Sequence, residues 1–106
     1  MKLGIVVYSG DSETVWNAFR FANFSLAMAD KVMVFLLGKG VECDTLDTGK
    51  FMVSEQMKSF LEAGGKGWVC STCLEIHKRE APKMFSLATL KNLHDIVEQS
   101  DRVLTF

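Results

Sequence analysis

The sequence predicts an α/β protein with three layers, in which a five-stranded, mainly parallel sheet lies between helices. Short apolar runs alternate with longer stretches of helical periodicity from one end of the chain to the other. The run Val32 to Leu37 is apolar throughout, which is typical of a strand buried on both faces of a parallel sheet. Because parallel strands are joined by right-handed crossovers, the helices must cover both faces.

The first strand and helix are predicted at the start of the chain. Residues 2–8 contain the β-branched trio Ile5, Val6 and Val7, which indicates a buried strand. The sequence Ser9-Gly10-Asp11-Ser12 follows as a turn. Ser12 is a plausible N-cap, and apolar residues then recur at helical spacing as far as Asp30.

The second and later elements follow the same alternation. A strand is predicted at 31–37, closed by Gly38-Lys39-Gly40, and a helix at 53–63, ended by Gly64-Gly65. A strand is then predicted at 67–70. It is followed by a helix from Cys73 toward Arg79, which starts at a Thr72/Glu75 capping box and is stopped before Pro82. The last predicted elements are a strand at 83–87, a helix with the apolar stripe Leu90, Leu93, Ile96 and Val97, and a strand at 102–106.

Length, composition and charge narrow the class of protein. The chain has 106 residues, of which 48% are hydrophobic and 24% charged, so we expect one globular domain over residues 1–106 that folds without a metal or disulfide. The 12 basic and 13 acidic side chains give 12 − 13 = −1, which argues against nucleic acid as a partner. No apolar run approaches the roughly 20 residues that cross a bilayer. We expect a soluble cytoplasmic protein with no membrane partner.

The three cysteines are the side chains in this sequence that are most suited to chemical reactivity. Their odd number, and the short spacing between Cys70 and Cys73, indicate free thiols in a reducing compartment. Cys70-Ser71-Thr72-Cys73 lies where a predicted strand runs into a helix, and a helix start lowers the pKa of a thiol. We expect Cys70 to be the nucleophile, with its sulfur directed toward solvent, and Cys73 to be shielded. The alternative is that both are small buried hydrophobic residues.

The predicted topology brings three loops to one edge of the sheet. The loops that follow parallel strands share the carboxyl edge, where ligands usually bind. We therefore expect Ser9, Gly10, Gly40 and Val41 to lie near Cys70 and Cys73, with Cys43 as a possible second thiol.

The residues at this edge include candidates for a metal site and for a phosphate site. Cys43, Cys70, Cys73 and His77 could form a Cys₃His zinc site, but structural zinc ligands usually come as two paired knuckles and Cys43 stands alone. Gly38-Lys39-Gly40 lacks the spacing of a phosphate-binding loop. We expect no metal and no cofactor.

The ordered features resemble those of the DsrE/DsrF-like (YchN-like) proteins of sulfur-relay and sulfur-oxidation systems. The resemblance rests on the Ser9-Gly10 turn, the Ala-rich stretch 16–29, the strand and Gly-Val turn at 35–41, the Val69-Cys70 pair and the closing segment 100–106. It covers nearly the whole chain.

The resemblance implies a fold, an assembly and a chemistry. The family fold is a five-stranded parallel sheet between helices, assembled as trimers or hexamers. In members that transfer sulfur, the cysteine at the position of Cys70 carries a persulfide between a donor and an acceptor protein, without a cofactor. Cys73, which many relatives lack, and Cys43 depart from the family pattern, so either could be a resolving or a structural thiol.

Three functions remain open from the sequence. The first is a sulfur carrier or sulfurtransferase subunit that uses Cys70. The second is a thiol-disulfide oxidoreductase that uses Cys70 and Cys73, for which Trp68 two residues ahead offers some support. The third is a non-catalytic assembly or regulatory protein of the same fold. Phe19, Phe21 and Phe24 fall on more than one face of the first helix, which indicates either a homo-oligomer that covers the remaining apolar surface or a helix that is buried on several sides.

Overall fold

The computed structural model describes all residues from 1 to 106 and confirms the three-layer α/β fold. Its five strands are all parallel and lie in the order β4-β3-β2-β1-β5. The elements in chain order are β1 (Lys2–Val7), α1 (Ser12–Ala27), β2 (Lys31–Leu36), the 3₁₀ helix η1 (Gly38–Thr45), α2 (Val53–Glu62), β3 (Lys66–Cys70), α3 (Ser71–His77), β4 (Ser86–Ala88), α4 (Leu90–Gln99) and β5 (Arg102–Thr105).

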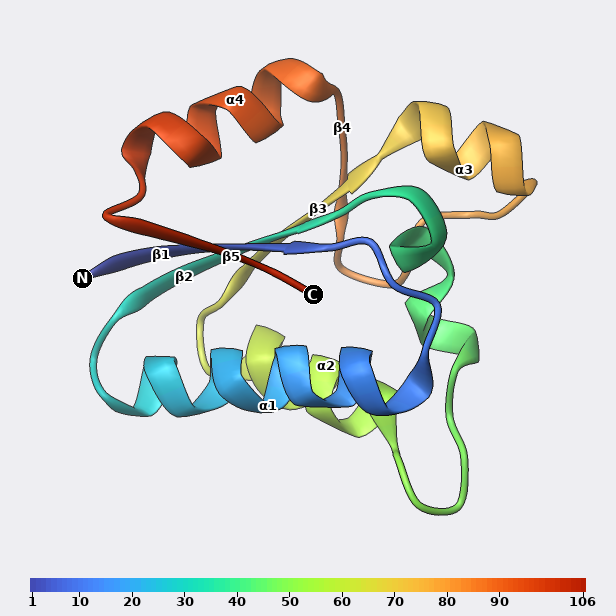
Figure 1. The fold of residues 1–106 in the computed structure, drawn as a ribbon, viewed down its shortest axis with the longest axis horizontal. Coiled ribbons are helices and arrows are strands. Elements are labelled where there is room, and N and C mark those ends of the chain that lie inside the picture. The colour runs from blue at the N-terminus through green and yellow to red at the C-terminus, as the bar shows by residue number, and fades with distance from the viewer.

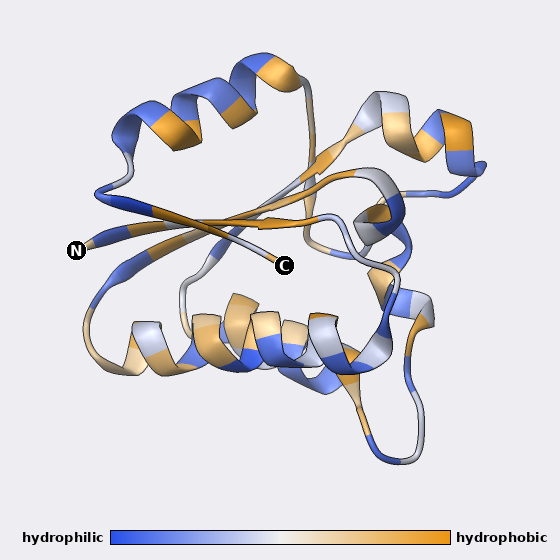
Figure 2. Cartoon of the chain, viewed as in Figure 1, coloured by the Kyte–Doolittle hydropathy of each residue, from blue (hydrophilic) through white to orange (hydrophobic).

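The helices form two layers on opposite faces of the sheet. Helices α1 and α2 lie together on one face, and α3 and α4 lie on the other (Figure 1). The central strands are the most hydrophobic segments, whereas α4 and α2 alternate polar and apolar positions (Figure 2). This pattern fits helices that bury one face against the sheet. None of the helices combines the length and the apolar character needed to span a bilayer.

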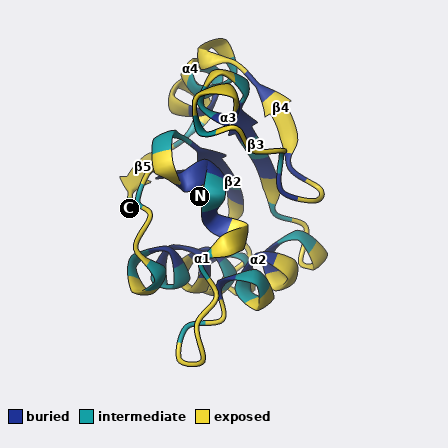
Figure 3. Ribbon diagram, turned by 90° about the vertical axis from the view of Figure 1, so that its right-hand side faces the viewer, coloured by how far each residue is buried: buried dark blue, intermediate teal, exposed yellow.

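The core is centred on β1 and β2, which occupy the middle of the sheet. Ile5 and Val7 of β1 and Val34 and Phe35 of β2 are fully buried. The edge strands β4 and β5 are largely exposed, as the view along the carboxyl edge shows (Figure 3). The sheet therefore packs most tightly at its centre and leaves open edges.

Helix α1 begins and ends differently from the prediction. Asp11, not Ser12, is its N-cap, because the Asp11 carboxylate accepts hydrogen bonds from the backbone N–H and the hydroxyl of Thr14, both at 2.9 Å. The Ser12 hydroxyl donates instead to the carbonyl of Leu46 at 2.7 Å. The helix ends at Ala27 rather than Asp30, since Ala29 takes a left-handed conformation with φ 67°.

Helix α3 is shorter than predicted and begins earlier. It starts at Ser71 with Cys70 as its N-cap, so the predicted Thr72/Glu75 capping box does not form. It ends at His77 because Lys78 is left-handed, with φ 53° and ψ 47°, before Pro82 is reached. As a result, Cys70 is the N-cap of α3 and Cys73 lies in its first turn.

The last strands and the last helix also shift slightly. Strand β4 covers Ser86–Ala88 rather than 83–87, and β5 ends at Thr105. The N-terminus of α4 is capped by a side chain, because Asn92 Oδ1 accepts a hydrogen bond from the Thr89 backbone N–H at 2.9 Å. The order of strands and α-helices is the predicted one, but the 3₁₀ helix η1 forms where only a turn and loop were predicted.

Candidate functional site

The carboxyl ends of the three central strands form one edge. Val7 pairs with Leu36, and Leu36 pairs with Val69, so β1, β2 and β3 end in register. The segments that follow them are the turn from Tyr8 to Asp11, helix η1 and the start of α3. The predicted loop cluster is thus brought together in space (Figure 1).

Close backbone packing joins the first two of these segments. A Cβ atom on Gly40 would lie 2.0 Å from the carbonyl oxygen of Val7, so only glycine fits there. Gly10 packs against the side chain of Lys39, and the Ser9 hydroxyl accepts from the Asp11 N–H at 3.0 Å. Val41, predicted to line the site, is fully buried in the core, because η1 turns it inward.

Cys70 and Cys73 lie on either side of the junction between β3 and α3. Cys70 is the last residue of β3 and is 5% exposed, whereas Cys73 is half-buried in the first turn of α3. The expectation of an exposed Cys70 and a shielded Cys73 is therefore wrong. The reason is packing, since Cys70 belongs to the buried hydrophobic core, whereas Cys73 only packs against that core from one side.

The pKa of Cys73 is set by burial and by two neighbouring residues. Burial raises the pKa of the Cys73 thiol, and the adjacent Cys70 thiol raises it further. The nearby Gly38 backbone opposes both effects because it stabilises the thiolate. The expected lowering of the pKa by a helix start is thus overturned for Cys73, because burial outweighs it. The two thiols are close enough to influence one another.

Two side-chain contacts join η1 to the end of α3 and to the residues that follow it. His77 Nδ1 lies 3.5 Å from Glu42 Oε2, and Arg79 Nη2 lies 3.7 Å from Asp44 Oδ1. Both pairs are partly shielded from solvent. They therefore link the second half of η1 to the end of α3 and to the residues directly after it.

Cys43 does not join the other thiols. Its side chain is fully buried, and its Sγ lies 3.6 Å from the Sδ of Met57. Burial, with a smaller effect of Asp44, raises the pKa of Cys43 to about 12. A thiol in this state is protonated and inaccessible, so it has the character of a core residue.

The four candidate zinc ligands do not converge. No three His, Cys, Asp or Glu side chains surround a common point. Cys43 contacts Met57, and His77 pairs with Glu42. The arrangement therefore does not fit a Cys₃His site.

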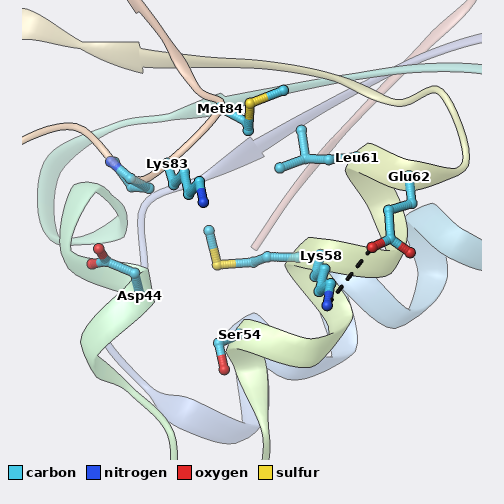
Figure 4. A pocket seen from close by; sticks show the side chains of 9 residues that line it. Asp44, Ser54, Lys58, Leu61, Glu62, Lys83 and Met84 are labelled. Atoms are coloured by element: carbon cyan, nitrogen blue, oxygen red, sulfur yellow. Dashed lines mark ion pairs between the residues drawn. The ribbon is translucent and has the colours of Figure 1, made fainter.

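A cleft of about 490 Å³ lies away from the thiol pair (Figure 4). One wall is α2, with Lys58 paired to Glu62, and the opposite wall is the segment Lys83-Met84. Its lining includes Met57 but neither Cys70 nor Cys73. The thiol chemistry and this cleft are thus separate features.

Comparisons with known proteins agree with the arrangement of strands and helices. The sequence model of the DsrE/DsrF-like family matches residues 1–106. The chain belongs to the DsrE/DsrF-like family. The protein MJ0989 of Methanocaldococcus jannaschii is 28% identical over 114 residues, with both chains covered in full.

Two solved structures share this DsrE/DsrF-like fold. The YchN protein of E. coli superposes with a TM-score of 0.84 at 20% identity, and both chains are covered in full. BT1422 of Bacteroides thetaiotaomicron superposes with a TM-score of 0.79 at 18% identity, over 99% of this chain and 94% of its own. At these identities the likeness concerns the fold.

Two residues of the site were missed by sequence reasoning. Gly38 contributes its backbone to Cys73, and Glu42 anchors η1 through His77. The Gly38-Lys39-Gly40 sequence was interpreted only as a turn. Its position directly after a buried parallel strand was the available signal, because such segments lie at the carboxyl edge.

Proposed function

We propose that this DsrE/DsrF-like protein is a sulfur carrier that holds a sulfur atom as a persulfide on Cys70 and passes it to a thiol of a partner protein. The observation that carries the proposal is the position of Cys70 at the end of a central strand, with a second thiol beside it, in a family associated with sulfur relay. The partners are a donor and an acceptor protein in the cytoplasm.

Burial of Cys70 is compatible with storage of sulfur. A persulfide releases its outer sulfur to any accessible thiolate, so a carrier needs to shield that sulfur from small thiols in solution. The low exposure of Cys70 supplies such shielding. Delivery to a partner then requires that the partner, or a local opening of the edge, gives access to Cys70.

The test is retention of sulfur by the whole chain. The protein is incubated with a persulfide donor, separated from it by gel filtration and weighed intact. Wild type should still hold one additional sulfur atom after gel filtration, Cys70→Ser should have lost any sulfur that it took up transiently, and Cys43→Ala should behave as wild type. Equal retention by wild type and Cys70→Ser would contradict the proposal.

A second candidate function is thiol-disulfide exchange between Cys70 and Cys73. It is favoured by one observation, the mutual influence of the two thiols across the β3–α3 junction. The same mass measurement separates the two functions. Loss of two hydrogen atoms after mild oxidation, with no gain of sulfur from the donor, would support the oxidoreductase.

We further propose that the protein forms a homo-oligomer, such as a trimer or hexamer, through the outer surface of α1 and β5. Phe24 on α1 is 61% exposed, and Met28, directly after the helix, is 64% exposed. Phe21, Phe24 and Leu104 also line one hollow between α1 and β5. Exposed apolar side chains gathered on one face are typical of interaction sites, and β5 is an open sheet edge beside them.

A further inference from the structure

We infer that Cys73 is the thiol that first accepts sulfur from a large persulfide donor and that it then hands the sulfur to Cys70. The inference rests on the proposed function and adds a role for the second cysteine. It starts from the unequal exposure of two adjacent thiols.

Access distinguishes the two cysteines. Sulfur transfer requires the attacking thiolate to meet the outer sulfur of the donor along the line of the breaking S–S bond. Cys70 is enclosed by the core, so a donor sulfur attached to a peptide or protein cannot reach it in the closed structure. Cys73 is half-buried one helical turn further along, and it therefore meets a large donor first.

Cys73 is reachable by a large donor but is not strongly activated. Burial raises the pKa of the Cys73 thiol, the neighbouring Cys70 raises it further, and the Gly38 backbone opposes the rise. We therefore expect acceptance of sulfur by Cys73 to be the slower of the two steps.

The two steps balance without an oxidant or reductant. The Cys73 thiolate attacks the outer sulfur of a donor R–S–SH, the donor S–S bond breaks, and R–S⁻ leaves and takes up a proton. The Cys70 thiolate then attacks the outer sulfur of the Cys73 persulfide, which forms the Cys70 persulfide. The Cys73 thiolate leaves and takes up the proton that Cys70 released. Adjacency of the thiols makes the second step intramolecular and fast.

The test compares a large and a small donor on four forms of the chain. Wild type, Cys70→Ser, Cys73→Ala and Cys43→Ala are each mixed with glutathione persulfide or with inorganic polysulfide. Samples are alkylated at successive times, and the sulfur is located by fragmentation of the tryptic peptide 67–78, which carries both cysteines. Circular dichroism confirms that each variant is folded.

The inference predicts a donor-dependent effect. Cys73→Ala should slow loading of Cys70 from glutathione persulfide by at least about tenfold, because the accessible acceptor is lost. Loading from polysulfide should change less than about twofold, since a small donor needs no outer thiol. In Cys70→Ser, sulfur should collect transiently on Cys73, and Cys43→Ala should match wild type.

Other outcomes separate this inference from the proposed function. If Cys73→Ala loads Cys70 from both donors at the wild-type rate, or if Cys70→Ser carries no sulfur on Cys73, the role of Cys73 is wrong while Cys70 remains the carrier. If Cys73→Ala does not fold, the Cys70→Ser result alone decides. If wild type gains no sulfur from either donor, the proposed function itself fails.

Discussion

The Sγ atom of Cys43 lies 3.6 Å from the Sδ atom of Met57, inside the part of the core where η1 meets α2. The contact places one of three cysteines out of reach of solvent and of the other two. It also makes Cys43 a suitable control residue for every experiment on Cys70 and Cys73.

Burial of Cys43 predicts a pH-dependent loss of stability. Its pKa is about 12 in the folded protein and 9.0 for an ordinary thiol, so the folded state binds the proton more tightly. The resulting stability is fully present below pH 9 and is lost as pH rises toward 12. Between pH 8.5 and 10.5, the free energy of unfolding, measured with urea, should fall by roughly 2 kcal/mol more for wild type than for Cys43→Ala. Equal losses would show that the thiol is hydrated in the folded protein.

The Asp11 cap predicts an acid-sensitive start of α1. Hydrogen bonds from the Thr14 backbone and hydroxyl lower the pKa of Asp11. Asp11 therefore contributes stability above the unfolded pKa of 3.8, and this contribution is lost as pH falls through the lower folded value. Asp11→Ala should lower the urea midpoint at pH 7. Asp11→Asn, which keeps a capping oxygen, should restore most of it and remove the acid dependence. A midpoint for Asp11→Ala equal to wild type at pH 7 would refute the cap.

The close approach of Gly40 to Val7 predicts that one methyl group added at position 40 strongly destabilises the protein. A Cβ at position 40 would lie 2.0 Å from the Val7 carbonyl oxygen, which must then move with β1. Gly40→Ala should cost about 3 kcal/mol or more of unfolding free energy. The matched control is Gly49→Ala, where nothing lies within 4 Å, and it should stay within about 0.5 kcal/mol. Similar unfolding curves for the two variants would argue against the close approach.

Exposed aromatic residues on α1 predict a change in assembly. Phe24→Asp places a charge in the proposed interface and should reduce the molar mass measured by light scattering toward that of one chain. Val97→Asp, which alters an exposed apolar residue of α4 on the opposite layer, should leave the assembly intact. A wild-type protein with the mass of a single chain would overturn the oligomer proposal.

The elements were predictable because their signals are local. The apolar runs around Ile5 and Val34 and the helical stripe ending at Val97 each appear where they were expected. Helix boundaries were less predictable, since Asp11 and Ser12 are both good caps and only the geometry of Thr14 and Leu46 decides between them. The start of α3 was misplaced for a similar reason, because the Thr72/Glu75 spacing fits a capping box that does not form.

By itself, the sequence determined the alternation of strands and helices, the parallel sheet and the gathering of strand-end loops at one edge, because these follow from hydrophobic periodicity and the handedness of crossovers. Only the tertiary structure decided how the three thiols differ. Exposure, the Gly38 contact with Cys73 and the Met57 contact with Cys43 arise from segments far apart in the chain. A thiol's accessibility and pKa depend on such neighbours, which no local pattern specifies.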